Sequence, residues 1–196
     1  MPLTSRQAEG VRSRELLLKS AIEYMARPGR AVNFDEIASA VGLTKGALYH
    51  HFGSVDGLVE AVFKEAVRLH AERVISASAA GSGRERLQAL IDASAMLYGS
   101  DTLFYRLLLR LHVEAGTTRP FLAPVARRVQ RRQRDYMSGL VRDGQQDGSI
   151  RADVDPKAVG ETVNAVMQGL LVQQIEEASD QRHAAERFGD LLEILL

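Results

Sequence analysis

Residues 33–58 read NFDEIASAVGLTKGALYHHFGSVDGL, which predicts two short helices joined by a tight turn. Asn33 stands where a helix N-cap is wanted, and Glu36 three residues later completes the pattern of a capping box. Gly42 ends the first helix, because glycine adopts the left-handed backbone at little cost. Thr44 then caps a second helix. The stretch therefore predicts a helix-turn-helix.

The second of these helices has one apolar side and one polar side. Leu48 and Phe52 are spaced to pack against the first helix. The opposite side offers hydrogen-bond donors, flat rings and one glycine that allows close approach, and a helix that enters the major groove of DNA needs such a surface. The outward residues of this helix are Lys45, Gly46, Tyr49, His50 and His51.

The sequence LTKGALYHHF at residues 43–52, preceded by DEIA and followed by SVDGL, resembles the TetR family of transcriptional regulators. The similar region covers roughly residues 12–65. The resemblance implies a homodimer whose paired N-terminal domains bind a palindromic operator of double-stranded DNA. It also implies a helical C-terminal domain that senses a small effector.

The resemblance assigns places to individual residues of the predicted interface. It puts Thr44, Lys45 and Gly46 at the start of the recognition helix, with Tyr49 and His51 facing phosphate or base edges. Many members carry a lysine where this chain has Val55, and that lysine touches phosphate. The full predicted DNA-binding set is Asn33, Thr44, Lys45, Gly46, Tyr49, His50 and His51.

Composition limits the class of protein. Lys and Arg number 25 and so do Asp and Glu, so the net charge gives no global reason to bind nucleic acid. Residues 1–54 carry seven basic and five acidic side chains, a surplus of two, so local placement must supply phosphate contacts. Cysteine is absent, which excludes disulfides and thiolate chemistry. The sequence shows no signal peptide and no uninterrupted apolar run long enough to cross a membrane, so we expect a cytoplasmic protein without a membrane partner.

Helix-breaking residues divide the chain into helical segments, and no strand pattern is visible. The predicted fold is all-α, with about nine helices. A helix-turn-helix domain of three helices is expected over residues 1–75, and an antiparallel helical bundle for ligand sensing and dimerisation over 76–196. Residues 1–11 are expected to be frayed. The helices beyond the motif are expected at 54–79, 84–98, 102–115, 120–146, 156–177 and 181–196.

Two helices near the C-terminus carry a candidate dimer interface. One has a stripe of small residues at helical spacing, along which two backbones can approach closely, and the last has an apolar face. An intramolecular core is the alternative. The predicted interface residues are Ala158, Thr162, Ala165, Gly169, Phe188, Leu191, Leu192 and Leu195.

A ligand pocket is expected between the helices that begin near residues 84, 102, 120 and 156, since helical bundles hold such sites in their interiors. Plain core packing is the alternative for most of its residues. An arginine-rich stretch at 119–134 is either a solvated face, paired with acids such as Glu176, Glu177, Glu186 and Glu193, or a site for an anionic ligand. The predicted pocket residues are Met96, Tyr105, Leu109, His112, Gln133, Met137 and Met167.

Other functions find little support in the sequence. His50 and His51 point about 100° apart on a helix and have no third ligand at a suitable spacing, so no metal site and no cofactor are expected. Motifs of common enzymes are absent, so no catalytic activity is expected. The leading hypothesis is a repressor that releases its operator when an effector binds. The alternatives are an activator of the same architecture, and a helical binding protein or enzyme that does not bind DNA.

Overall fold

The computed structural model describes residues 4–177, and within them it contains helices and no strand. The all-α prediction is therefore confirmed, and the predicted helix at 181–196 lies outside the described residues. The helices are α1 (Ser5–Ala26), α2 (Phe34–Ser39), α3 (Lys45–Phe52), α4 (Val55–Ala77), α5 (Gly83–Ser100), α6 (Thr102–Gly116), the short 3-10 helix η1 (Pro120–Leu122), α7 (Ala123–Asp147) and α8 (Pro156–Glu177).

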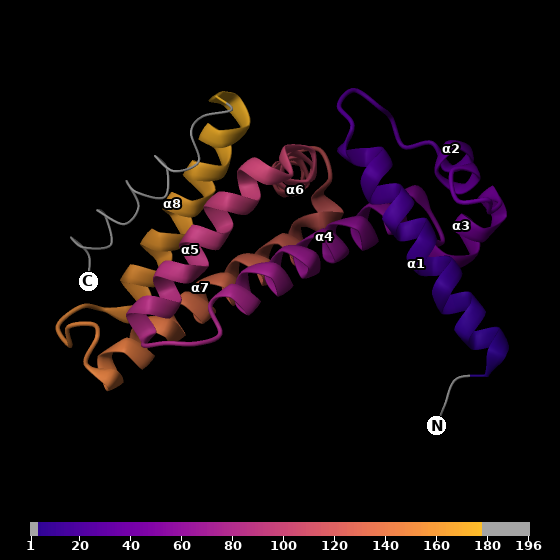
Figure 1. Cartoon of the computed structure of the whole chain (residues 1–196). Helices are drawn as coiled ribbons and strands as arrows, with labels where there is room; N and C mark the ends of the chain where they lie inside the picture. The colour runs from indigo at the N-terminus through magenta and orange to yellow at the C-terminus, as the bar shows by residue number, and fades with distance from the viewer. Residues whose placement is uncertain (1–3, 178–196) are drawn as a thin grey trace.

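The helices form two groups that α4 connects. Figure 1 shows α1, α2 and α3 gathered at one end of the molecule, and α5, α7 and α8 packed side by side at the other. Helix α4 runs from the first group into the second, and α6 packs against α1 as well as α4. None of the helices between residues 4 and 177 is long and apolar enough to span a lipid bilayer.

The first helix begins earlier than the sequence analysis predicted. Thr4 and Gln7 form a capping box, in which the Gln7 side chain accepts the Thr4 backbone N–H at 2.9 Å. Helix α1 therefore starts at Ser5, and the prediction of a frayed segment over residues 1–11 is wrong for residues 5–11. The reason is local, because two side chains bond backbone N–H groups that a helix start otherwise leaves without partners.

A large apolar core joins the two groups of helices. It includes Leu17 of α1, Leu48 of α3, Phe63 of α4 and Leu111 of α6, which are fully buried. A second core lies among α5, α7 and α8 around residues such as Leu87. Because one core serves both groups, a displacement of α6 meets packed side chains of α1 and α4 rather than solvent.

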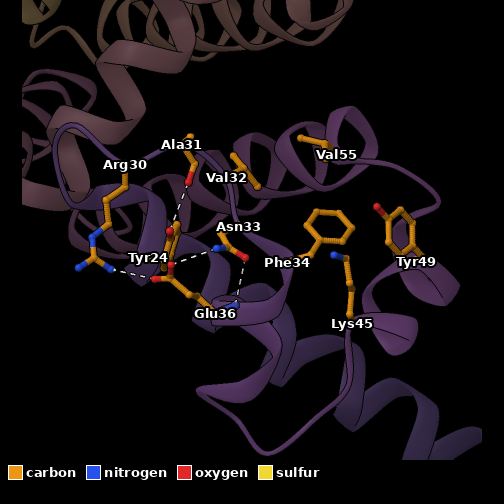
Figure 2. Close-up of a pocket in the computed structure, with 10 residues that line it drawn as sticks. All are labelled: Tyr24, Arg30, Ala31, Val32, Asn33, Phe34, Glu36, Lys45, Tyr49 and Val55. Carbon is orange, nitrogen blue, oxygen red and sulfur yellow. Dashed lines mark hydrogen bonds and ion pairs between the residues drawn. The ribbon is translucent and has the colours of Figure 1, made fainter.

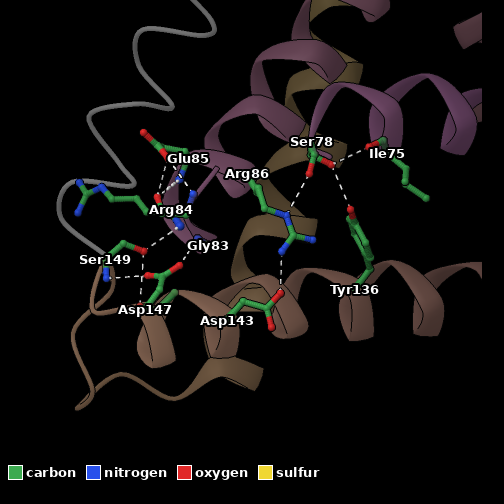
Figure 3. Close-up of polar contacts among 12 residues, drawn as sticks. Ile75, Ser78, Gly83, Arg84, Glu85, Arg86, Tyr136, Asp143, Asp147 and Ser149 are labelled. Carbon is green, nitrogen blue, oxygen red and sulfur yellow. Dashed lines mark hydrogen bonds and ion pairs between the residues drawn. The ribbon is translucent and has the colours of Figure 1, made fainter. Parts of the chain in front are cut away.

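Polar contacts fix the far end of α4 to α5 and α7 (Figure 3). The Ser78 hydroxyl lies 3.1 Å from the Tyr136 hydroxyl, and the Ser78 carbonyl accepts a hydrogen bond from Arg86 Nε at 3.1 Å. Arg86 also pairs with Asp143 at 2.8 Å. These bonds tie the end of α4 at two points, so α4 cannot turn freely against the bundle.

A buried histidine lies where α4 meets α5 and α6. His70 Nδ1 is 3.1 Å from the Tyr105 hydroxyl, and its ring stacks on Tyr98 with 6.0 Å between centroids. Burial, helped by the charge of Arg73, lowers the pKa of His70 to about 4. No motif in the sequence marks His70, although its spacing from Phe63 and Val74 places it on the inner face of α4.

We predict that His70 makes the fold acid-sensitive. Between about pH 6.5 and pH 4 the unfolded chain binds a proton at His70 that the folded chain does not. The free energy of unfolding should therefore fall by about 1.4 kcal/mol per pH unit across this window. Urea denaturation at several pH values measures the slope. His70→Gln should make this pH slope shallower. His50→Gln, at an exposed position, is the control and should leave the slope unchanged. Equal slopes in the parent and in His70→Gln would contradict the prediction.

Candidate nucleic-acid interface

Asn33 caps α2, as the sequence predicts. Its side-chain oxygen accepts the backbone N–H groups of Asp35 and Glu36 at 3.0 and 3.3 Å. The other bond of a capping box, from the Asn33 backbone N–H to the Glu36 side chain, is not formed in the described residues. The Glu36 carboxylate instead accepts the Asn33 side-chain amide at 3.0 Å and pairs with Arg30 at 3.3 Å (Figure 2). Arg30 competes for the carboxylate that the predicted box requires.

The turn between α2 and α3 has the predicted geometry. Gly42 has a φ of +68°, in the left-handed region that favours glycine. The Thr44 side chain accepts the Ala47 backbone N–H at 3.3 Å and so caps α3. Leu48 is fully buried, which anchors one face of α3 in the core. The helix-turn-helix prediction is confirmed.

Helix α1 supports this motif from behind. The buried hydroxyl of Ser20 donates to the Ile37 carbonyl at 2.8 Å, which fixes α2 on α1. The guanidinium of Arg14 lies over the Phe52 ring, 5.3 Å from its centroid, at the end of α3. These contacts hold α2 and α3 as one rigid unit, which a DNA reader needs because its side chains must meet base edges in fixed positions.

The free face of α3 carries the predicted DNA-binding residues. Lys45, Gly46, Tyr49 and His50 are exposed, and His51 is half-buried. A Cβ added at Gly46 would meet only the Thr44 hydroxyl, at 3.6 Å, so this part of the helix can approach another surface closely. Burial, with the charges of His50 and Arg14, lowers the pKa of His51, which favours its neutral form.

An aromatic contact sets the position of Tyr49. Its ring centroid lies 4.8 Å from that of Phe34, with the planes tilted by 52°. Phe34 is buried and Tyr49 is 47% exposed, so the buried Phe34 ring holds the exposed Tyr49 ring in position. Sequence analysis did not predict this role for Phe34. The two rings, with Lys45 and the loop before α2, line a hollow of about 620 Å³ whose rim includes Val55 (Figure 2).

Lys45 is held by an acid of the neighbouring helix. Its Nζ lies 2.9 Å from Asp35 Oδ2, and this hydrogen bond and charge raise the pKa of Lys45, which keeps it positive. The sequence alone does not pair Asp35 with Lys45, because only the turn brings α2 and α3 together. The carboxylate directs the lysine along the motif and also competes with any phosphate for it.

We predict that Asp35→Asn tightens duplex binding several-fold. The substitution removes a negative charge beside the expected phosphates and leaves Lys45 free to contact them. Fluorescence anisotropy with the duplex upstream of the gene measures the change. Glu60→Gln is the matched control, because Glu60 also pairs with a lysine, Lys64, but on α4. An unchanged or weakened affinity for Asp35→Asn would contradict the prediction.

The predicted pocket residues do not meet in one place. Tyr105 is fully buried in the core shared by α1, α4 and α6, and Leu109 packs against the same core. His112 lies edge-on to Phe63, 5.9 Å between centroids, and its Nε2 is 2.8 Å from Gln130 Nε2. The remaining predicted residues lie elsewhere: Met137 and Met167 are in the second core, Gln133 is half-buried on α7, and Met96 is 65% exposed.

The predicted dimer residues on α8 share its free side. All four are exposed, whereas Val159, Val163 and Met167 of the same helix are buried in the second core. Helix α8 thus packs one face inward and leaves the small-residue stripe open. These four are Ala158, Thr162, Ala165 and Gly169; Phe188, Leu191, Leu192 and Leu195 lie outside the described residues.

The arginines of α7 are mostly on the surface. Arg127, Arg128, Arg131 and Arg132 are exposed. The side chains of their expected acidic partners lie outside the described part of the chain, so that pairing stays a prediction. In the part that is described, no cluster of three or more His, Asp or Glu side chains could hold a metal ion.

Comparisons with known proteins agree with this geometry. A family model described as "BetI-type transcriptional repressor, C-terminal" matches residues 83–196, and one described as "Bacterial regulatory proteins, tetR family" matches residues 17–62. The HTH-type transcriptional repressor KstR2 of Rhodococcus jostii (strain RHA1) is 28% identical over 159 residues. That alignment covers 79% of this chain and 75% of that protein.

Solved structures share the fold. A TetR-family regulator from Rhodococcus sp. has a TM-score of 0.80 at 19% identity, covering 94% of this chain and 98% of that one. A regulator from Saccharomonospora viridis in complex with choline has a TM-score of 0.81 at 21% identity, covering 93% and 96%. AibR in complex with isovaleryl coenzyme A and operator DNA has a TM-score of 0.66 at 21% identity, covering 90% and 95%.

The N-terminal match falls on α1 to α4, where the helix-turn-helix lies, and the C-terminal match covers more than half of the sequence. The chain therefore belongs to the TetR family and is a ligand-responsive, DNA-binding transcriptional regulator.

Proposed function

We propose that the protein is a dimeric repressor that binds two operator half-sites through α3 and releases them when a small effector binds its C-terminal helices. The observation that carries this proposal is the two-sided character of α3. Leu48 anchors one face in the core, while Lys45, Gly46, Tyr49 and His50 are exposed on the other. Donors and rings on a rigid helix are what a major groove accepts.

Dimerisation is proposed to use the open side of α8. The exposed stripe of Ala158, Thr162, Ala165 and Gly169 lets a second α8 approach closely around a twofold axis. Two copies are required because one eight-residue helix reads only a half-site. Successive major grooves on one face of DNA are about 34 Å apart, so the dimer must hold its two α3 helices near that spacing.

The effector is proposed to act by changing this spacing. Release requires only that the effector prefer the arrangement that does not fit DNA, typically by about 1–3 kcal/mol. Choline and isovaleryl coenzyme A are bound in two regulators of the same fold and are the first probes to try. The effector site is proposed among α5, α7 and α8, near Gln133, Met137 and Met167, whereas Met96, which is 65% exposed, contacts an effector only if one binds at the surface.

An anisotropy titration tests the proposal. The labelled duplex is the region upstream of the protein's own gene, and the titration is run at two salt concentrations with an unrelated duplex of equal length as control. We expect tight, salt-dependent binding to the upstream duplex only. Addition of choline or isovaleryl coenzyme A tests release. Absence of salt-dependent binding would favour a helical binding protein, and tighter binding with an effector would contradict effector-driven release.

A further inference from the structure

Helix α1 ends beside a side chain of α6. The last carbonyls of any helix lack partners within it, and the last turn of α1 contains no basic residue that could serve them. Arg110 of α6 fills this role, because its Nη2 donates to the Met25 carbonyl at 2.7 Å. A cation at a helix C-terminus also interacts favourably with the helix dipole. Helix α6 therefore binds the end of α1 directly.

One turn further along α6, Glu114 lies between two arginines. Its carboxylate is 3.8 Å from Arg110 Nε and 2.9 Å from Arg119 Nε. The Arg119 backbone N–H also donates to the Glu114 carbonyl at 2.7 Å, so the loop after α6 is tied back to the helix. Arg119 continues the chain of contacts, since its Nη1 lies 3.9 Å from Asp56 in the first turn of α4.

These contacts connect the two ends of the helix-turn-helix segment. Met25 is the last residue but one of α1, before the loop that leads into α2, and Asp56 follows α3 by four residues. Everything in residues 27–54, including the DNA-binding face, thus lies between two points that the end of α6 holds. The side chain of Glu114 is 25% exposed, so its pairing with Arg119 is less screened than a pair at the free surface.

We propose that Arg110, Glu114 and Arg119 form an ion-pair relay that sets the position of the DNA-binding unit relative to the C-terminal helices. They are positioning residues, because they act through α1 and α4 rather than by touching DNA. The inference rests on the proposed function, since it explains how a change in the C-terminal helices reaches α3.

One donor of the relay has no hydrogen bond in the described residues. Arg110 Nε is buried and makes no hydrogen bond within residues 4–177, while the nearest Glu114 oxygen is 3.8 Å away. A small movement of Glu114 toward Arg110 satisfies this donor and lengthens the bond to Arg119. The same movement frees Arg119 from Glu114, so the shared carboxylate can pair mainly with one arginine or with the other.

Spin-label distances test the relay without DNA. The chain has no cysteine, so His50→Cys and Met96→Cys accept one label each, at the DNA-binding face and on α5. Both positions are exposed. Labelled chains are diluted into excess unlabelled chain, so that only distances within one protomer are measured. We expect one narrow distance in this doubly labelled parent.

Three substitutions and one control are then compared in that background. Glu114→Gln and Arg110→Met should broaden or shift the distance. Arg110→Lys, which keeps a cationic donor for the Met25 carbonyl, should largely restore it. Glu60→Gln breaks an ion pair within α4 and should leave the distance unchanged. If circular dichroism shows that Arg110→Met has lost its helices, the spin-label distance in Glu114→Gln tests the relay, because glutamine has the size of glutamate.

A duplex titration separates failure of the relay from failure of the proposed function. Glu114→Gln should bind the upstream duplex roughly 5-fold or more weakly, because α3 is less well positioned. An unchanged spin-label distance in both Glu114→Gln and Arg110→Met would overturn the relay, even if the parent binds DNA. If the parent binds no duplex, the proposed function is refuted. A broadened spin-label distance in Glu114→Gln would still support the relay in that case.

Discussion

Lys45→Ala and Tyr49→Ala are each expected to weaken binding to the upstream duplex by at least about 10-fold, because a dimer loses the contact at both half-sites. The two variants should differ in their salt dependence. If Lys45 contacts one phosphate in each half-site, its removal lowers the slope of log K against log salt by about 1.8. Tyr49→Ala should leave that slope nearly unchanged if the ring faces base edges.

Anisotropy titrations at three or more salt concentrations measure both quantities. Lys64→Ala is the control, since Lys64 is an exposed lysine paired with Glu60 on α4, away from the DNA-binding face. It should bind as the parent does. Circular dichroism and sedimentation confirm that each variant keeps its fold and assembly state. Parent-like affinity in both Lys45→Ala and Tyr49→Ala would remove α3 from the interface.

The largest loss of stability is expected from Gly83→Ala. Gly83 begins α5 where this helix crosses α7, and an added Cβ would lie 2.1 Å from the Gly144 nitrogen and 2.5 Å from the Leu140 carbonyl oxygen. These are backbone atoms, so the two helices must separate. The separation also strains the hydrogen bond from the Gly83 N–H to Asp147 at 2.8 Å (Figure 3). We expect a loss of about 3 kcal/mol in the free energy of unfolding.

Gly139→Ala gives the matched control for this substitution. Gly139 lies inside α7, and no heavy atom would come within 4 Å of a Cβ added there. Alanine should therefore raise the free energy of unfolding by about 0.5–1 kcal/mol, as in an ordinary helix interior. Urea denaturation measures both variants. If Gly83→Ala were as stable as Gly139→Ala, the close crossing of α5 and α7 would be wrong.

Local signals in the sequence predicted the fold well. Asn33, Thr44 and Ser54 each cap the helix that the sequence places after them, and Gly42 makes the predicted turn. Such signals act within a few residues, so a single sequence shows them. Thr4 and Gln7 give the same kind of signal, and their capping box starts α1 at Ser5, within the stretch that the polar composition of residues 1–11 predicts to be frayed.

Contacts between distant residues could not be predicted in the same way. The bond between Lys45 and Asp35 spans 10 residues, that of His70 with Tyr105 spans 35, and that of Arg110 with the Met25 carbonyl spans 85. Helical periodicity shows which residues share a face, but not which neighbouring helix that face meets. Of the predicted pocket residues, Tyr105 and Leu109 therefore pack in one core and Met137 and Met167 in the other, while Met96 lies on the surface.

Affinity cleavage shows whether α3 lies in the major groove twice per assembly. A DNA-cleaving iron chelate attached through His50→Cys becomes the chain's one thiol-linked group, because the natural sequence contains no cysteine. Val113→Cys, 57% exposed on α6, carries the same chelate as control. We predict two clusters of cuts in the upstream duplex, about 10 base pairs apart, from His50→Cys alone. No cuts, or the same cuts from both positions, would contradict the account.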